Sequence, residues 1–156
     1  MDSIVERFRK HAPSRSIHCS KIKKSGCSLK KTRLPEPYVI IDLDKLDQLE
    51  NKEAPSCADF LFVTDRHGGW IVSIEMKKGN PDVVKSAEQI QSTIQVFEDW
   101  IDGVTGITFQ PLLVSGRFSK HERKLLSISR NKILFRGHKH PIDRIRCDSE
   151  LSQIFE

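Results

Sequence analysis

The sequence lacks the features that mark membrane, secreted and disulfide-stapled proteins. No stretch of its 156 residues approaches the roughly 20 apolar residues needed to span a bilayer. The first ten residues lack the apolar core of a secretion signal. The four cysteines show no regular pairing pattern and no Cys-x₂₋₄-Cys spacing typical of zinc sites. We therefore expect a cytoplasmic protein without a membrane partner, in which Cys57 and Cys147 are small buried hydrophobic residues.

Two common catalytic signatures are missing as well. The chain has no GxxxxGK phosphate-binding loop and no motif for a nucleophilic serine, and it contains no internal repeat. Its 17.9 kDa mass, with 37% hydrophobic and 30% charged residues, predicts one folded domain over residues 1–156.

Acidic residues are absent from one long segment and concentrated in another. Residues 7–33 contain ten Lys or Arg and no acid, and residues 117–146 contain ten against two acids. The centre, 34–116, holds fourteen acidic and six basic residues. Basic flanks suit nucleic acid, whereas an acidic centre opposes such binding unless a cation is bound there. A charge run is as often simply a solvated face.

Two basic regions are therefore candidates for binding a nucleic acid, with DNA favoured. One is a polar loop or arm at about 11–37, which has room for a short strand, and the other is a C-terminal extension at about 117–156. The candidate binding residues of the arm are Lys21, Lys23, Lys24, Lys30 and Lys31.

The apolar pattern predicts an α/β fold with a mixed central sheet flanked by helices. Pro111 within one predicted strand suggests an edge position or an irregularity. Helices are expected at 3–10, 83–101 and 119–129. Strands are expected at 38–46, 59–64, 70–77, 107–115, 132–135 and 142–146.

The strands 59–64 and 70–77 flank a glycine-bearing turn and are expected to form a hairpin. If the turn centres on His67, the numbers of facing residues sum to 134, which places Asp59 opposite Glu75. Facing residues project from one side of the sheet, and so do alternate residues of one strand, so Lys77 joins them. A one-residue bulge would shift this register.

Two adjacent carboxylates repel each other unless a cation lies between them. Oxygen ligands of this kind suit Mg²⁺, and a nearby lysine can orient or help to deprotonate a water that attacks a phosphodiester. The alternative is that Asp59, Glu75 and Lys77 are ordinary residues of a solvated strand face.

An aspartate at the start of one strand, then Glu75-Met76-Lys77 at the end of the next, then a helix, resembles the PD-(D/E)XK nuclease superfamily. The resemblance covers roughly residues 3–115 and implies a restriction-endonuclease-like core of order αβββαβ, with C-terminal additions. Ala58 stands where the motif has proline, which leaves the subfamily open.

The resemblance implies a role for each matching residue. Asp59 and Glu75 would bind Mg²⁺ or Mn²⁺ together with the carbonyl of Met76, and Lys77 would be the catalytic lysine. A glutamine of the following helix is also implied, Gln89 before Gln91. Glu6 matches a glutamate that the superfamily often contributes from its first helix, although a capping box with Ser3 explains it equally well.

The expected function is thus a Mg-dependent nuclease acting on DNA, as a homodimer or within a larger nuclease complex. One alternative is a catalytically silent nucleic-acid-binding module of the same fold. Another is a basic protein-interaction subunit of a larger complex, in which the carboxylates are solvated.

Overall fold

The structure, a computed structural model, describes residues 2–17, 21–46 and 57–156. One of the four cysteines, Cys19, and with it residues 18–20 of the segment 11–37, lies outside these ranges. The α-helices in the described ranges are α1 (Ile4–His11), α2 (Val83–Phe97) and α3 (Lys120–Ser127). The strands there are β1 (Ile22–Lys24), β2 (Cys27–Leu29), β3 (Tyr38–Asp42), β4 (Phe60–Thr64), β5 (Trp70–Lys77), β6 (Thr108–Ser115), β7 (Ile133–Phe135), β8 (His138–His140) and β9 (Asp143–Arg146).

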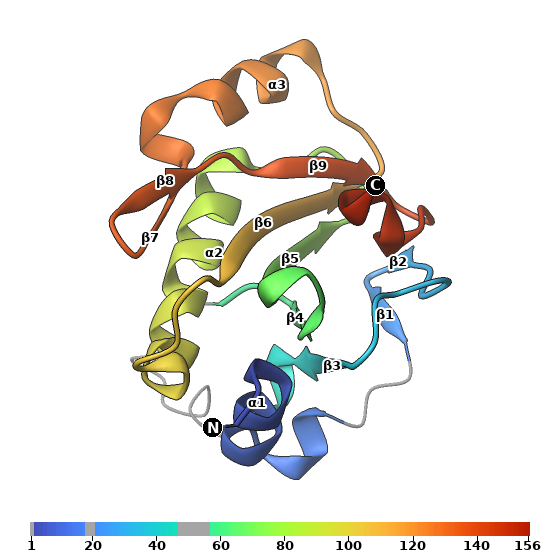
Figure 1. Ribbon diagram of the computed structural model, residues 1–156. Helices are drawn as coiled ribbons and strands as arrows, with labels where there is room; N and C mark the ends of the chain where they lie inside the picture. The colour runs from blue at the N-terminus through green and yellow to red at the C-terminus, as the bar shows by residue number, and fades with distance from the viewer. Residues whose placement is uncertain (1, 18–20, 47–56) are drawn as a thin grey trace.

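Five strands form a mixed central sheet in the order β3-β4-β5-β6-β9. The first three are antiparallel neighbours, whereas β5, β6 and β9 run parallel. The predicted α/β class is therefore confirmed, with α1 before the antiparallel strands and α2 as the crossover from β5 to β6. The carboxyl ends of β5, β6 and β9 meet at one edge of the sheet (Figure 1).

Most element boundaries follow the sequence pattern closely, but the strand expected over 38–46 ends at Asp42, because Leu43–Lys45 is a 3₁₀ helix in which the side chain of Asp42 accepts from the N–H of Asp44. β5 has the predicted bounds, and α2 ends earlier than predicted because its last turn, Glu98–Ile101, is a 3₁₀ helix. The hairpin register is also as predicted, since Phe60 pairs with Ile74 and every other pair of β4 and β5 keeps the sum of 134.

Each face of the sheet buries its own apolar cluster because side chains alternate along a strand. Odd-numbered residues of β4 and β5, such as Leu61 and Ile71, pack against α1 and α2. Even-numbered residues, such as Phe62 and Ile74, pack against the β1–β2 hairpin and the C-terminal 3₁₀ helix Leu151–Phe155. Any polar odd-numbered residue of β5 therefore lies on the face that the helices cover.

The described parts of the segment 11–37, residues 11–17 and 21–37, are mostly irregular, and the short strand for which the sequence left room is present as one strand of a hairpin. This is the antiparallel β1–β2 hairpin, whose Ile22 and Leu29 are buried against the sheet. The lysine-rich composition concealed these apolar positions. Figure 1 shows the hairpin beside the C-terminus.

A disulfide joins Cys27 of this hairpin to Cys147, with 5.1 Å between the Cα atoms. The prediction that Cys147 is a buried hydrophobic residue is therefore wrong, and the cysteine pattern no longer supports a reducing compartment. Cys57 is half-buried and packs against the helix-side core.

The C-terminal region adds a fifth strand to the central sheet. β9 pairs with Leu112–Ser115 of β6, while β7 and β8 form a separate hairpin. Pro111 directly precedes the residues paired with β9, so β6 is an inner strand only beyond its proline.

The loops that follow β5 and β6 approach each other closely at Gly116. A Cβ on Gly116 would lie 2.1 Å from the carbonyl oxygen of Lys78, so the loops after β6 and β5 cross where only glycine fits.

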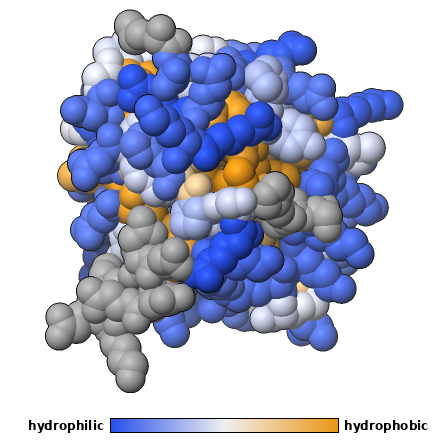
Figure 2. Space-filling view, turned by 90° about the horizontal axis from the view of Figure 1, so that it is seen from below, coloured by the Kyte–Doolittle hydropathy of each residue, from blue (hydrophilic) through white to orange (hydrophobic). Residues whose placement is uncertain are grey.

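The face seen from below Figure 1 has apolar atoms at its centre and hydrophilic residues around them (Figure 2). Within the described residues, no helix is both long and apolar enough for a membrane span.

Candidate active site

Asp59 and Glu75 meet at the open end of the β4–β5 hairpin. The paired ladder of β4 and β5 ends at Phe60 and Ile74, and the N–H of Asp59 donates to the carbonyl of the same Ile74 at 2.9 Å, so the backbone of Asp59 is shifted by one residue, as in a bulge, from the register that would pair it with Glu75. The two residues are only 4% and 1% exposed, and their carboxyl groups are close enough to interact with each other. The two carboxyl groups are therefore close to each other, as expected, although Asp59 is not paired with Glu75 in the ladder.

The contact perturbs the acidity of Glu75 strongly. Burial is the largest cause, and the hydrogen bond to Asp59 and the charge of Asp59 add to it, so the pKa of Glu75 rises from 4.5 to about 9. The positive charges of Lys77 and Lys24 act in the opposite direction. This environment favours the neutral form of Glu75 at neutral pH, as expected for a buried carboxyl group beside another one without a cation between them.

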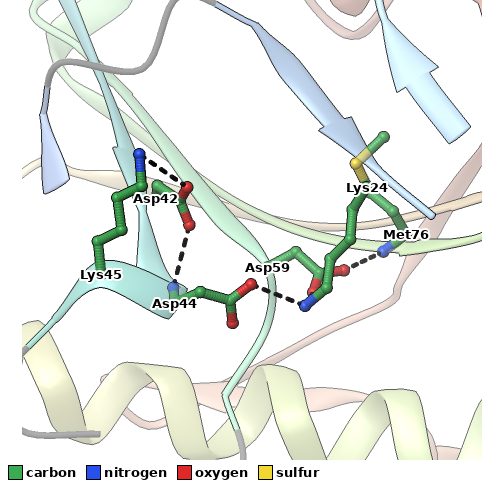
Figure 3. A network of polar contacts seen from close by, with 6 residues as sticks. All are labelled: Lys24, Asp42, Asp44, Lys45, Asp59 and Met76. Carbon is green, nitrogen blue, oxygen red and sulfur yellow. Dashed lines mark hydrogen bonds and ion pairs between the residues drawn. The ribbon is translucent and has the colours of Figure 1, made fainter. Parts of the chain in front are cut away.

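Asp59 has two further partners, one in the backbone and one in the β1–β2 hairpin. Its Oδ2 accepts from the N–H of Met76 at 2.8 Å, while its Oδ1 accepts from Nζ of Lys24. The same ammonium contacts Oδ2 of Asp44 at 2.9 Å, so it bridges the two aspartates (Figure 3).

Lys24 thus has a different place from the one predicted for it. Its partly exposed ammonium is paired with two carboxylates of the site, and its binding of nucleic acid stays a prediction. Burial alone would lower the pKa of Lys24, but the hydrogen bonds to Asp59 and Asp44 outweigh burial and raise it well above its ordinary value. The other candidate residues of the arm, Lys21, Lys23 and Lys30 as exposed residues and Lys31 as a partly buried one, are oriented to the surface, and their binding of nucleic acid stays a prediction.

Lys77 ends β5 on the same face as Glu75, and its side chain is partly exposed. Its charge favours ionisation of Glu75. The side chain of Met76 is buried on the opposite face. Its carbonyl points to the Asp59 side of β5, because the N–H and C=O of one strand residue point the same way and this N–H bonds to Asp59.

β5 and α2, which are packed against each other, carry four side-chain oxygens that are buried and have no hydrogen-bond partner among the described residues; we refer to these four oxygens as the polar strip. These are Ser73 Oγ, Glu75 Oε2, Ser86 Oγ and Gln89 Oε1. Ser73 and Ser86 were missed in the sequence, although Ser73 is two residues before Glu75 and so shares its face. Unpartnered buried oxygens are costly, which makes this strip an expected place for a bound cation or water.

Two further candidates have structural roles. Gln91 exchanges two hydrogen bonds with the backbone of Leu134, at 2.9 and 2.8 Å, and so attaches β7 to α2. Glu6 accepts from the N–H of Ser3, while Ser3 Oγ accepts from the N–H of Glu6, both at 3.2 Å. Neither Gln91 nor Glu6 joins the carboxylate pair, whereas Oε1 of Gln89 is one of the four oxygens of the polar strip.

The donor set suits a hard divalent cation, although the described residues contain no group of three or more His, Cys, Asp or Glu that could hold one. Two carboxylates and one carbonyl are oxygen ligands, which Mg²⁺ and Mn²⁺ accept together with several waters. The proton favoured on Glu75 and the ammonium of Lys24 both mark a site of strongly negative potential. The residues therefore fit such an ion.

Comparisons with protein-family models, curated proteins and solved structures find no match for this chain. The resemblance to the PD-(D/E)XK superfamily accordingly depends on the residues and the element order alone.

Proposed function

We propose that this chain is a metal-dependent nuclease of the PD-(D/E)XK type with a restriction-endonuclease-like core. The observation that supports the proposal most is the contact between the buried carboxyl groups of Asp59 and Glu75, on the sheet face that also carries Lys77. A buried acidic pair is costly in an ordinary sheet, since each carboxylate pays for desolvation. Such a pair is expected where a cation binds.

Each residue has a distinct task in this proposal. Asp59, Glu75 and the carbonyl of Met76 would hold Mg²⁺ or Mn²⁺. The bound ion would supply charge neutralisation and a water acidic enough to attack a phosphodiester. Lys77 holds an ammonium at the exposed rim, where it attracts the phosphate and orients the attacking water. Gln89 offers its buried amide to the same strip.

A second candidate function is a nucleic-acid-binding module of the same fold that does not cut. The contact of Lys24 with Asp59 favours it, because an internal ammonium already neutralises one carboxylate without a metal. A third, a basic protein-interaction subunit, requires solvated carboxylates, and the burial of both acids weighs against it.

Cleavage and metal titration together separate these functions. The purified protein is incubated with Mg²⁺ or Mn²⁺ and with linear, circular, single-stranded and branched DNA, and with RNA. Calorimetric titration with Mn²⁺ is performed on the same preparations. We expect cleavage of DNA, and we expect Asp59→Ala and Glu75→Ala to lose metal binding and turnover together.

Lys77→Ala is expected to behave differently, because it removes a charge without removing a ligand. It should bind Mn²⁺ at least as tightly as the unmodified protein while cleavage collapses. Glu88→Gln on the exposed side of α2 and Lys78→Ala, whose side chain lies along Gly26, are matched controls that should cleave normally. Full cleavage by Lys77→Ala, or unaltered Mn²⁺ affinity in both carboxylate variants, would refute the nuclease. Metal-independent DNA binding without cleavage would instead support the silent module.

A further inference from the structure

Two adjoining clefts at the carboxyl edge of the sheet are lined by arginines. One, of about 260 Å³, is lined by Phe118, Arg123, Arg144, Ile145 and Arg146. The other, of about 460 Å³, shares Phe118 and Arg146 with it and adds Asn80, Gly116, Arg117 and Ser119. We refer to both together as the arginine groove.

The register of the sheet connects this groove with the carboxylate pair. Glu75 pairs with Leu113, and Leu113 pairs with Arg144. Two residues further along the strands, Lys77 pairs with Ser115, and Ser115 pairs with Arg146. Paired residues of parallel neighbours project to the same face, so both arginines share a face with Glu75 and Lys77.

The distance from β5, which carries Glu75 and Lys77, to β9, which carries the arginines, is short. Adjacent strands are about 4.8 Å apart, so the backbones of β5 and β9 are separated by about 10 Å. The loops between them are in contact as well, since the N–H of Gly116 donates to the carbonyl of Lys77 at 3.2 Å. The arginine groove therefore adjoins the end of β5 that carries Glu75 and Lys77.

The charges in the groove are of one sign. All four arginines are exposed at their side chains, and no lining residue among those described is acidic. Glu122, which directly precedes Arg123 in the chain, is buried and accepts a hydrogen bond from Asn80 at 2.8 Å. Arg144 lies over the ring of Phe118, 5.6 Å from its centroid, which limits the side-chain freedom lost on binding.

We propose that the arginine groove binds the sugar-phosphate backbone of the nucleic acid whose reacting phosphate lies at Glu75 and Lys77. This proposal rests on the proposed function, and it assigns backbone contacts to Arg117, Arg144 and Arg146, which the sequence placed in the basic C-terminal extension without distinguishing them from its other basic residues. Guanidinium groups suit this task because they donate two parallel hydrogen bonds to a phosphate. Such contacts position the strand and read no sequence.

The test measures binding in EDTA, so that it does not depend on cleavage. Fluorescence anisotropy follows the full-length protein on a labelled 20-base-pair DNA of mixed sequence and on its single strand, from 50 to 200 mM salt. We expect Arg144→Gln and Arg146→Gln each to weaken binding by about tenfold. Each should also flatten the log–log salt slope by about 0.9 on duplex, or about 0.7 on the single strand.

Two further variants separate phosphate contact from folding and from total charge. Arg144→Lys keeps the charge and should retain most of the salt slope. Lys139→Gln makes the same change in charge on β8, outside the central sheet, and should leave the slope unchanged. Melting temperatures of all variants are recorded to confirm that they are folded.

The outcomes separate this proposal from the nuclease itself. Binding by Arg144→Gln and Arg146→Gln that equals binding by Lys139→Gln would overturn the groove even if the protein cleaves DNA. Loss of binding in these variants, in a protein that never cleaves, would support the groove and refute the nuclease. Absence of binding to both probes by the unmodified protein would overturn the groove as well.

Discussion

Lys24 competes with any cation for Asp59, which makes its removal an informative perturbation. Its ammonium contacts the carboxylates of both Asp59 and Asp44. A divalent ion that binds Asp59 and Glu75 must therefore break or weaken the Lys24 contact. We predict that Lys24→Met, which keeps the length of the side chain and removes its charge, binds Mn²⁺ more tightly than the unmodified protein.

The size of the effect follows from how far the ion pair is buried. The side chain of Asp59 is 5% exposed and that of Lys24 is 37% exposed, so solvent screens the pair from one side only. Its strength lies between the ~0.2–1 kcal/mol of an exposed pair and the several kcal/mol of a buried one, at about 1–2 kcal/mol. Release of that competition corresponds to about 5–30-fold tighter Mn²⁺ binding.

The same substitution should destabilise the metal-free protein, because it leaves the buried carboxyl of Asp59 without its cation. At about 1–2 kcal/mol, a chain of this size should lose about 3–6 °C of melting temperature in EDTA. Mn²⁺ should recover this loss, since a ligand that binds only the folded state stabilises it. Calorimetric titration and thermal melting with and without Mn²⁺ measure the two effects.

Lys23→Met is the matched control, because Lys23 is the exposed neighbour on the opposite face of the same short strand. It should change neither the Mn²⁺ affinity nor the melting temperature. An affinity of Lys24→Met for Mn²⁺ that is equal to or weaker than that of the unmodified protein would refute the idea that the ammonium and the metal compete for one place.

Two other predictions concern stability. Since the folded protein holds a proton on Glu75 up to about pH 9 and an unfolded chain releases it near 4.5, metal-free stability should fall between these values as pH rises, by at most about 1.4 kcal/mol per pH unit. Urea unfolding in EDTA at pH 6 and 8 should show this slope, and Glu75→Gln should flatten it. The Cys27–Cys147 disulfide closes a separation of 120 residues, so Cys27→Ser with Cys147→Ser should cost about 2–5 kcal/mol in urea unfolding. Equal stability of the oxidised protein and the double variant would contradict this.

The hairpin and its carboxylates could be predicted because they depend on a rigid local rule. A strand alternates its side chains with a period of two, and a short turn fixes the register of its two strands. The register from Phe60 to Ile74 follows from the position of the turn alone, whereas the one-residue shift of the Asp59 backbone does not. The buried face of α2 could be predicted equally well, since its 3.6-residue period is unbroken from Val83 to Phe97.

Contacts between distant segments could not be predicted in the same way. Lys24 reaches Asp59 across 35 residues, and Cys27 reaches Cys147 across 120. Neither contact has a local signal, because both depend on how the β1–β2 hairpin packs on the even-numbered face of the sheet. The alternation of Ile22, Cys27 and Leu29 with polar residues was visible, but the run of lysines obscured it.

The strand with which β9 pairs could not be predicted from the sequence for a related reason. A short strand near the end of the chain can pair with either edge of a sheet, and its pattern does not say which. Its pairing with β6 determines whether Arg144 and Arg146 lie beside the carboxylates or far from them.

The division of charge along the chain acquires a physical meaning in the folded protein. The acidic centre of the sequence supplies Asp59 and Glu75, whose burial makes them dependent on positive charge. Both basic flanks return to the same edge of the sheet. The N-terminal flank brings Lys24 onto Asp59, and the C-terminal flank brings Arg144 and Arg146 into register with the site. Segments of opposite sign that are separated in the sequence thus become neighbours in space, and the positive charge that a phosphate requires lies next to the negative charge that a metal requires.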